Sequence, residues 1–132
     1  MPKLVDEGEN RILNILLGAT AVDATLYLGL YTNTTEPAET ANLAAITEPS
    51  GNGYARISLS RGANWTISGD LATYLEQTFT ATGVWGNVYG YFIATSSDGT
   101  GKLLFVEQFS NGPYNVQNNG DAIKVTPKIR AA

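Results

Sequence analysis

The chain has 132 residues, of which 43% are hydrophobic and only 15% are charged, and its net charge is −4 at neutral pH. This length suits one self-sufficient core, so we expect residues 1–132 to form a single domain. The sequence contains no cysteine and no histidine, which excludes disulfides, thiolate chemistry and the Ser-His-Asp triad. A weakly acidic chain lacks the charge of a nucleic-acid binder, and no apolar run is long enough to span a membrane.

The first segment has the spacing of an amphipathic helix. Its apolar residues recur mostly on one face, and three acids crowd its first turns, where the helix dipole favours anions. Gly18 follows the last apolar residue and can end the helix in a left-handed conformation. We therefore predict a helix over residues 3–18.

From residue 25 onward the apolar residues alternate with a period of two, which is typical of strands. In residues 26–31, leucines alternate with Tyr27, Gly29 and Tyr31, so we expect aromatic residues on the second face of this strand. A Ser-Ser-Asp-Gly turn at 96–99 predicts a hairpin that returns through residues 103–109. Seven or eight such strands follow one helix. The predicted fold is mainly β, a single β-sandwich or flattened barrel of antiparallel strands, with the β-domain at 25–130.

One long polar segment, residues 32–53, interrupts this pattern. It contains Pro37 and Pro49 together with Gly51 and Gly53. Connections longer than about 12–15 residues are uncommon in compact domains and often carry function. We expect Leu43 and its neighbours to anchor this segment to the domain, and the segment itself to be a contact element.

Few residues suggest catalysis or metal binding. Glu76, Glu107 and Asp121 are the acids that an enzyme would have to use, but nothing in the sequence places two of them at the separation that glycoside hydrolysis needs. Asp98 and Asp121 lie in predicted turns beside glycines, where aspartate is favoured for turn geometry alone. The acidic turns lack the remaining ligands of a calcium loop. We expect no enzymatic activity, no cofactor and no metal.

The aromatic residues permit two interpretations. Flat rings stack on sugar faces, so Trp85 and Tyr114, together with Asn115, Asn118 and Asn119, are candidate glycan contacts. The same rings could instead form core and cross-strand pairs in a small β-domain. Tyr114 is the stronger groove candidate of the two rings because it lies in a loop after Gly112–Pro113.

The segment from Leu26 to Ile129 resembles a group of small structural proteins of tailed bacteriophages. The resemblance rests on the order of several short motifs rather than on any single one. They are LYLGLYTN at 26–33, EPSGNGYA at 48–55, WTI at 65–67, QTFT at 77–80, VYGYF at 88–92, LLFVEQF at 103–109, NGD at 119–121 and IKVTP at 123–127. It implies a β-rich virion component, either a head decoration protein or a tail-fibre-like protein, and it brings no catalytic residues.

This resemblance implies two functions. The first is a capsid decoration or cement protein that clamps the major capsid protein and binds only the assembled shell. We expect a homo-oligomer, with a trimer favoured, located in the virion after synthesis in the host cytoplasm, with no nucleic-acid or membrane partner. The alternative is a tail, baseplate or fibre component that binds a glycan of the host surface. The expected subunit contacts, each of which could instead belong to the core, are Leu4, Val5, Ile12, Leu16 and Leu43.

Overall fold

The computed structural model describes residues 3–131, and its helix is shorter than the apolar spacing predicts. Helix α1 spans Asp6–Leu16, whereas Lys3–Leu4 form a short strand, β1. Strand β1 pairs antiparallel with β9, Leu103–Gln108. The predicted acids do occupy the first turn of α1, and Gly18 takes a positive φ of 79° just beyond its end. The prediction that the helix begins at residue 3 is wrong, because Lys3 and Leu4 pair with β9 as a strand instead.

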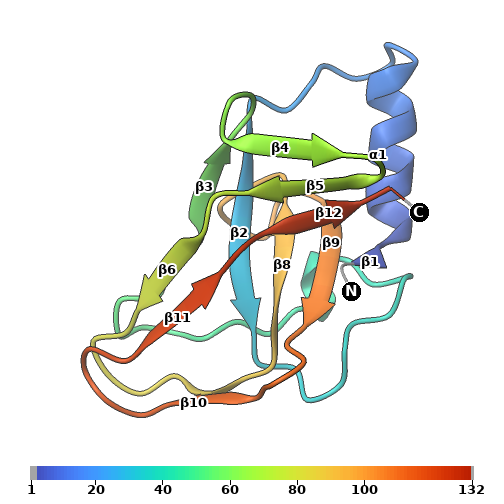
Figure 1. Cartoon of the computed structure of the whole chain (residues 1–132). Coiled ribbons are helices and arrows are strands. Elements are labelled where there is room, and N and C mark those ends of the chain that lie inside the picture. Colours follow the sequence, from blue (N-terminus) through green and yellow to red (C-terminus); the bar gives the residue numbers. More distant parts are fainter. Residues whose placement is uncertain (1–2, 132) are drawn as a thin grey trace.

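The largest layer is a five-stranded antiparallel sheet in the order β1-β9-β8-β2-β3. Its central strand is β8, Gly90–Ala94, which pairs with β9 and with β2, Thr25–Tyr31. Strand β2 pairs in turn with the edge strand β3, Ile57–Ser60. Strands β8 and β9 form the hairpin that the turn at residues 96–99 predicts. Helix α1 lies beside β9 at one side of this sheet (Figure 1).

The facing layer is a long ribbon folded from three small sheets, β12-β5-β4, β11-β6 and β10-β7. Figure 1 shows β5 running into β6, and β11 into β12, alongside one another. The bounds of these strands are β4 Trp65–Ser68, β5 Leu71–Tyr74, β6 Gln77–Thr80, β7 Gly86–Val88, β10 Tyr114–Val116, β11 Ala122–Val125 and β12 Lys128–Arg130.

The pairing register shows that these small sheets are parts of one antiparallel ladder. Val125 faces Gln77, and Val116 faces Gly86. Val116 lies nine residues before Val125, and Gly86 lies nine residues after Gln77, so the register of β11-β6 continues unchanged into β10-β7. Lys128 faces Thr73, three positions from Val125 on one strand and four from Gln77 on the other. The extra residue lies between β5 and β6, and it bends the ladder opposite Pro127.

The described residues form twelve strands, more than the seven or eight expected. Part of the difference comes from short strands outside the predicted runs, namely β1, β10 and β12. Pro127 has no N–H to donate, so β11 ends before it and the chain resumes pairing as β12 with a different strand. The fold class is nevertheless as predicted: mainly β, with antiparallel sheets in a sandwich-like arrangement and one helix.

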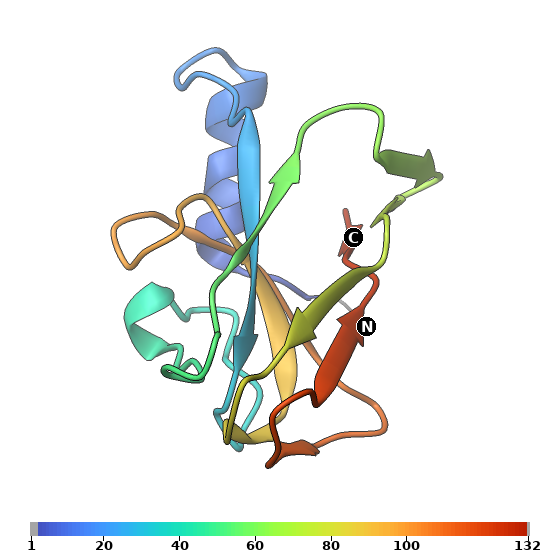
Figure 2. The same cartoon turned by 90° about the vertical axis from the view of Figure 1, so that its left-hand side faces the viewer.

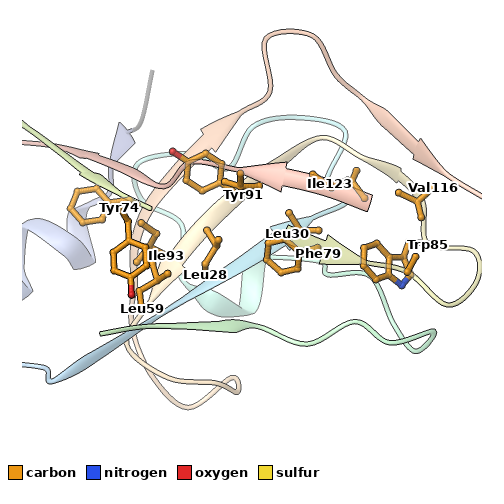
Figure 3. Close-up of a cluster of buried hydrophobic side chains, with 14 of the residues drawn as sticks. Leu28, Leu30, Leu59, Tyr74, Phe79, Trp85, Tyr91, Ile93, Val116 and Ile123 are labelled. Atoms are coloured by element: carbon orange, nitrogen blue, oxygen red, sulfur yellow. The ribbon is translucent and has the colours of Figure 1, made fainter. Parts of the chain in front are cut away.

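The main core fills the space between the two layers. Its side chains come from alternate positions of the central strands, such as Leu28 and Leu30 on β2 and Tyr91 and Ile93 on β8. Figure 3 shows them facing residues of the ribbon, including Phe79, Trp85 and Ile123. Two-layer burial of this kind is what stabilises a sandwich of short strands.

A second buried cluster lies on the opposite face of the same sheet. Tyr31 and Phe92 occupy the alternate positions of β2 and β8, as the sequence pattern predicts for an aromatic second face. Leu43, at the start of a short 3-10 helix, Leu43–Ala45, and Val5, just before α1, cover them. The long 32–53 segment thus packs on its own domain, as expected for Leu43.

Two glycines permit close approaches between these elements. A Cβ on Gly8 would overlap the carbonyl oxygen of Leu104, so α1 lies directly against β9. A Cβ on Gly90 would overlap the ring of Tyr31 and the carbonyl oxygen of Glu107. The absence of a side chain at these positions sets the spacing of helix, sheet and aromatic cluster.

Candidate interaction surface

The five predicted subunit contacts separate into buried and exposed groups. Val5 has no exposed surface and Leu43 is 8% exposed, and both pack against the second cluster of their own chain. The expectation that these two contact another subunit is corrected by this burial. Leu4 is half-buried against the main core. Ile12 and Leu16 are 42% and 75% exposed, so these two lie at the surface.

The predicted glycan contacts divide in the same way. Trp85 is only 8% exposed; its indole N–H donates to the carbonyl oxygens of Gly51 and Asn52, and its ring meets Tyr54 edge-on at 5.7 Å. Trp85 therefore holds the 32–53 segment and has no free ring face for a sugar. Tyr114 is 39% exposed, with its ring centroid 5.0 Å from that of Phe109.

The three asparagines of that set are exposed beside Tyr114 in sequence. Asn115 lies on β10, and its side-chain oxygen accepts from Gln117. Asn118 and Asn119 lie in the turn before β11, where Asp121 accepts the backbone N–H of Asn118. Only the exposed members of the predicted set are accessible to a ligand.

An apolar groove lies between α1 and the β12-β5-β4 sheet. Figure 2 shows α1 and β4 on opposite sides of β2. The inner part has a volume of about 320 Å³ and the outer part about 790 Å³, and both are lined by Leu26, Trp65 and Ile129. We name this surface the apolar groove. Its other lining residues include Ile12, Ile15, Val22, Leu59, Arg61, Ile67 and Ala72.

Cross-strand register explains why one wall of this groove is apolar. Ile67, Ala72 and Ile129 are direct partners across β4, β5 and β12, so they form one row on one face of the sheet. Trp65 and Tyr74 form the neighbouring row, with ring centroids 4.9 Å apart. The row of Ile67, Ala72 and Ile129 ends at Ile67, which lies on the edge strand β4 and is 76% exposed.

Two arginines line the apolar groove, and they differ in pairing. Arg11 donates to both carboxylate oxygens of Asp23, at 3.1 and 2.6 Å, and this hydrogen bond raises the pKa of the arginine. Arg61 follows β3 and is exposed. Its guanidinium has no hydrogen-bond or ion-pair partner among residues 3–131. The groove thus offers an apolar lining with one unpaired positive charge.

Comparison with protein families decides what kind of protein carries this surface. A family model described as podophage GP4 fiber I protein gp80 matches residues 3–128, nearly the whole chain. The chain belongs to this phage fibre family. A search of curated proteins finds no significant match.

Membership of the fibre family makes the chain a phage structural protein and a virion component. This agrees with the resemblance on which the sequence-based expectation rests. The match favours the tail-fibre alternative over capsid decoration, for which it gives no support. The tail-fibre expectation is therefore better supported than the leading expectation of a cement protein.

Two acids of this fibre-family protein, Asp98 and Asp121, accept hydrogen bonds within their own turns. The Asp98 carboxylate accepts from the backbone and hydroxyl of Thr100, which lowers its pKa, and Asp121 accepts from two backbone N–H groups of its turn. Burial raises the pKa of Tyr91, and the Glu107 carboxylate beside it raises it further. Across residues 3–131, no three acids gather as metal ligands, and no helix has the length and apolarity to cross a membrane.

Sequence reasoning missed Arg61 and Ile67 among the residues that line the groove. Trp65 and Ile67 lie two positions apart on β4. Their shared face follows from a period of two within that strand, but the groove also needs α1 and β12, which are distant in sequence. No local pattern indicates that these elements meet.

Proposed function

We propose that this chain is a structural subunit of a podophage tail fibre and that it acts by binding rather than by catalysis. The observation that carries the proposal is the fibre-family match over residues 3–128. The fold supports it, because the long loop is anchored to the domain while apolar surface remains exposed along α1 and β4. Apolar patches rimmed by polar residues are typical of sites of protein association.

Labelling of intact particles tests the location. Antibodies raised against the purified protein should label the tail of negatively stained virions, while an antibody against the major capsid protein labels the head of the same particles. Quantitative mass spectrometry of virions should give far fewer copies of this chain than of the capsid protein. Label spread over the head, with a copy number close to that of the capsid protein, would overturn the fibre assignment.

We further propose that any contact of this fibre subunit with a host glycan involves Tyr114 rather than Trp85. The half-exposed ring of Tyr114 and the neighbouring exposed amide of Asn115 support this choice. Flat rings with an adjacent amide suit a sugar face and its hydroxyls. A glycan array probed with the wild-type protein and with Tyr114→Ala tests it. Signals that persist in the variant, or no signal for the wild type, would reject this contact.

A further inference from the structure

Helix α1 carries a second apolar surface that its own chain leaves uncovered. Leu13, Leu16 and Leu17 are 55%, 75% and 78% exposed. They lie four, seven and eight positions after Glu9, which places all four side chains along one side of the helix. We name this stripe of Glu9, Leu13, Leu16 and Leu17 the leucine ridge.

We propose that the apolar groove of one subunit receives the leucine ridge of a second copy of this chain. The groove, at about 320 Å³ in its inner part, is large enough for side chains rather than for single waters of about 30 Å³ each. Its lining is mostly aliphatic and aromatic, which matches leucine side chains. Ile12 joins the two surfaces, since it lines the groove and is itself 42% exposed.

Charge complementarity selects the second copy as the occupant. Arg61 is exposed at the groove, and Glu9 is exposed at the N-terminal end of the leucine ridge. Neither side chain has a hydrogen-bond or ion-pair partner within the described part of the chain. An apolar ridge with one acid therefore meets an apolar groove with one base, and complementary charges of this kind fix register and partner choice.

The edge strand β4 adds a second reason to expect a covered surface. β4 is the outer strand of its sheet, so alternate N–H and C=O groups along it have no strand partner. Proteins protect such edges with charged residues or proline, but β4 reads Trp-Thr-Ile-Ser. Its exposed Ile67 borders the groove, so a subunit bound there would also shield this edge.

This contact would join the copies of the proposed fibre subunit, so its biological setting rests on the proposed function. Separate experiments can refute the self-association proposal and the proposed function. Self-association is measured on purified protein in solution, whereas the tail location is measured on the virion. A capsid protein could self-associate through this surface, and a tail protein could lack it.

Light scattering coupled to size exclusion tests the contact. We expect the wild-type protein to have the mass of a closed oligomer and Leu16→Glu to dissociate at least about tenfold more readily, because a charge would be buried in an apolar groove. Leu75→Glu is the matched control, since Leu75 is 60% exposed and lies between β5 and β6 outside the groove lining. Circular dichroism should show all three proteins folded. A monomeric wild type, or equal weakening by both substitutions, overturns the proposal.

A charge exchange identifies the occupant as a second copy. Glu9→Arg and Arg61→Glu should each weaken self-association, and the double variant Glu9→Arg/Arg61→Glu should recover most of it. Both residues are exposed, so neither change should disturb folding. A double variant no better than the single variants would show that these two residues do not meet across the interface.

Discussion

Arg56 holds Glu48 through two parallel hydrogen bonds, from Nε at 3.0 Å and from Nη2 at 2.8 Å. The Nη1 of the same arginine donates to the carbonyl oxygens of Ser96 and Asp98, and its guanidinium lies 5.0 Å from the centre of the Phe92 ring. Burial opposes the charge of Arg56, but the hydrogen bond and charge of Glu48 still raise its pKa. One side chain thereby joins the long 32–53 segment to the β8–β9 turn.

Loss of this arginine should destabilise the domain. The Arg56 side chain is 6% exposed, so Arg56→Ala removes the charged partner of the Glu48 carboxylate and one donor each from the carbonyl oxygens of Ser96 and Asp98. We expect a loss of about 3 kcal/mol in the free energy of unfolding, measured by urea denaturation. Lys102→Ala is the control, because Lys102 is 58% exposed in its ion pair with Glu7 and should cost less than about 1 kcal/mol. Similar losses of unfolding free energy in both variants would contradict the inference that Arg56 joins the 32–53 segment to the β8–β9 turn.

Tyr31, which is buried, and Tyr54, which is half-buried, should respond differently to loss of their hydroxyl. The Tyr54 hydroxyl accepts from the N–H of Leu30 and donates to Glu48, so Tyr54→Phe should lower the unfolding free energy by about 1–2 kcal/mol. The Tyr31 hydroxyl is buried and has no hydrogen-bond partner within residues 3–131. Tyr31→Phe should therefore leave stability unchanged or raise it by about 1 kcal/mol. A loss in Tyr31→Phe as large as in Tyr54→Phe would contradict this difference.

Stability should fall at alkaline pH. Burial raises the pKa values of Tyr31, Tyr54 and Tyr91 in the folded state, whereas the unfolded chain releases these protons near about pH 10. Their contribution is complete below about pH 10 and is lost as pH rises toward the folded pKa values, by about 1.4 kcal/mol per pH unit for each tyrosine. Urea titrations between about pH 9 and pH 11 measure the slope. Tyr54→Phe should show a shallower fall, and an identical slope would contradict the assignment.

The sequence predicts the class of the fold because its strongest signals are local. The period of two in residues 26–31 places Leu28 and Leu30 on one face and Tyr31 on the other, and the structure confirms both faces. The helix start was wrong at Lys3 and Leu4, since their pairing with β9 depends on residues about a hundred positions away. Long-range pairing overrides local spacing at such ends.

The candidate surface was predictable only in part. Ile12 and Leu16 were named from helical spacing alone, and both lie on the exposed apolar surface. Val5 and Leu43 have the same apolar character, but the chain covers them with its own second cluster. Apolar periodicity identifies a face that must be covered, but it does not distinguish cover by the same chain from cover by another.

Gly8 provides a test of how α1 is seated. Within a helix, alanine is normally favoured over glycine by about 1 kcal/mol. At this position, however, a Cβ would overlap the Leu104 carbonyl oxygen and lie 2.8 Å from Leu4 Cδ1, and the backbone of β9 cannot move without loss of sheet pairing. We therefore expect Gly8→Ala to lower the unfolding free energy by about 1–3 kcal/mol.

Gly99→Ala is the matched control for the expectation that Gly8→Ala destabilises the protein, although alanine normally stabilises a helix. A Cβ at Gly99 has no neighbouring heavy atom within 4 Å, and its φ is not in the left-handed region. Its effect in the same urea titration should stay within about 0.5 kcal/mol. A stabilising Gly8→Ala would mean that α1 can withdraw from β9. Because α1 forms one wall of the apolar groove through Ile12 and Ile15, such freedom would also mean that the groove has no fixed width.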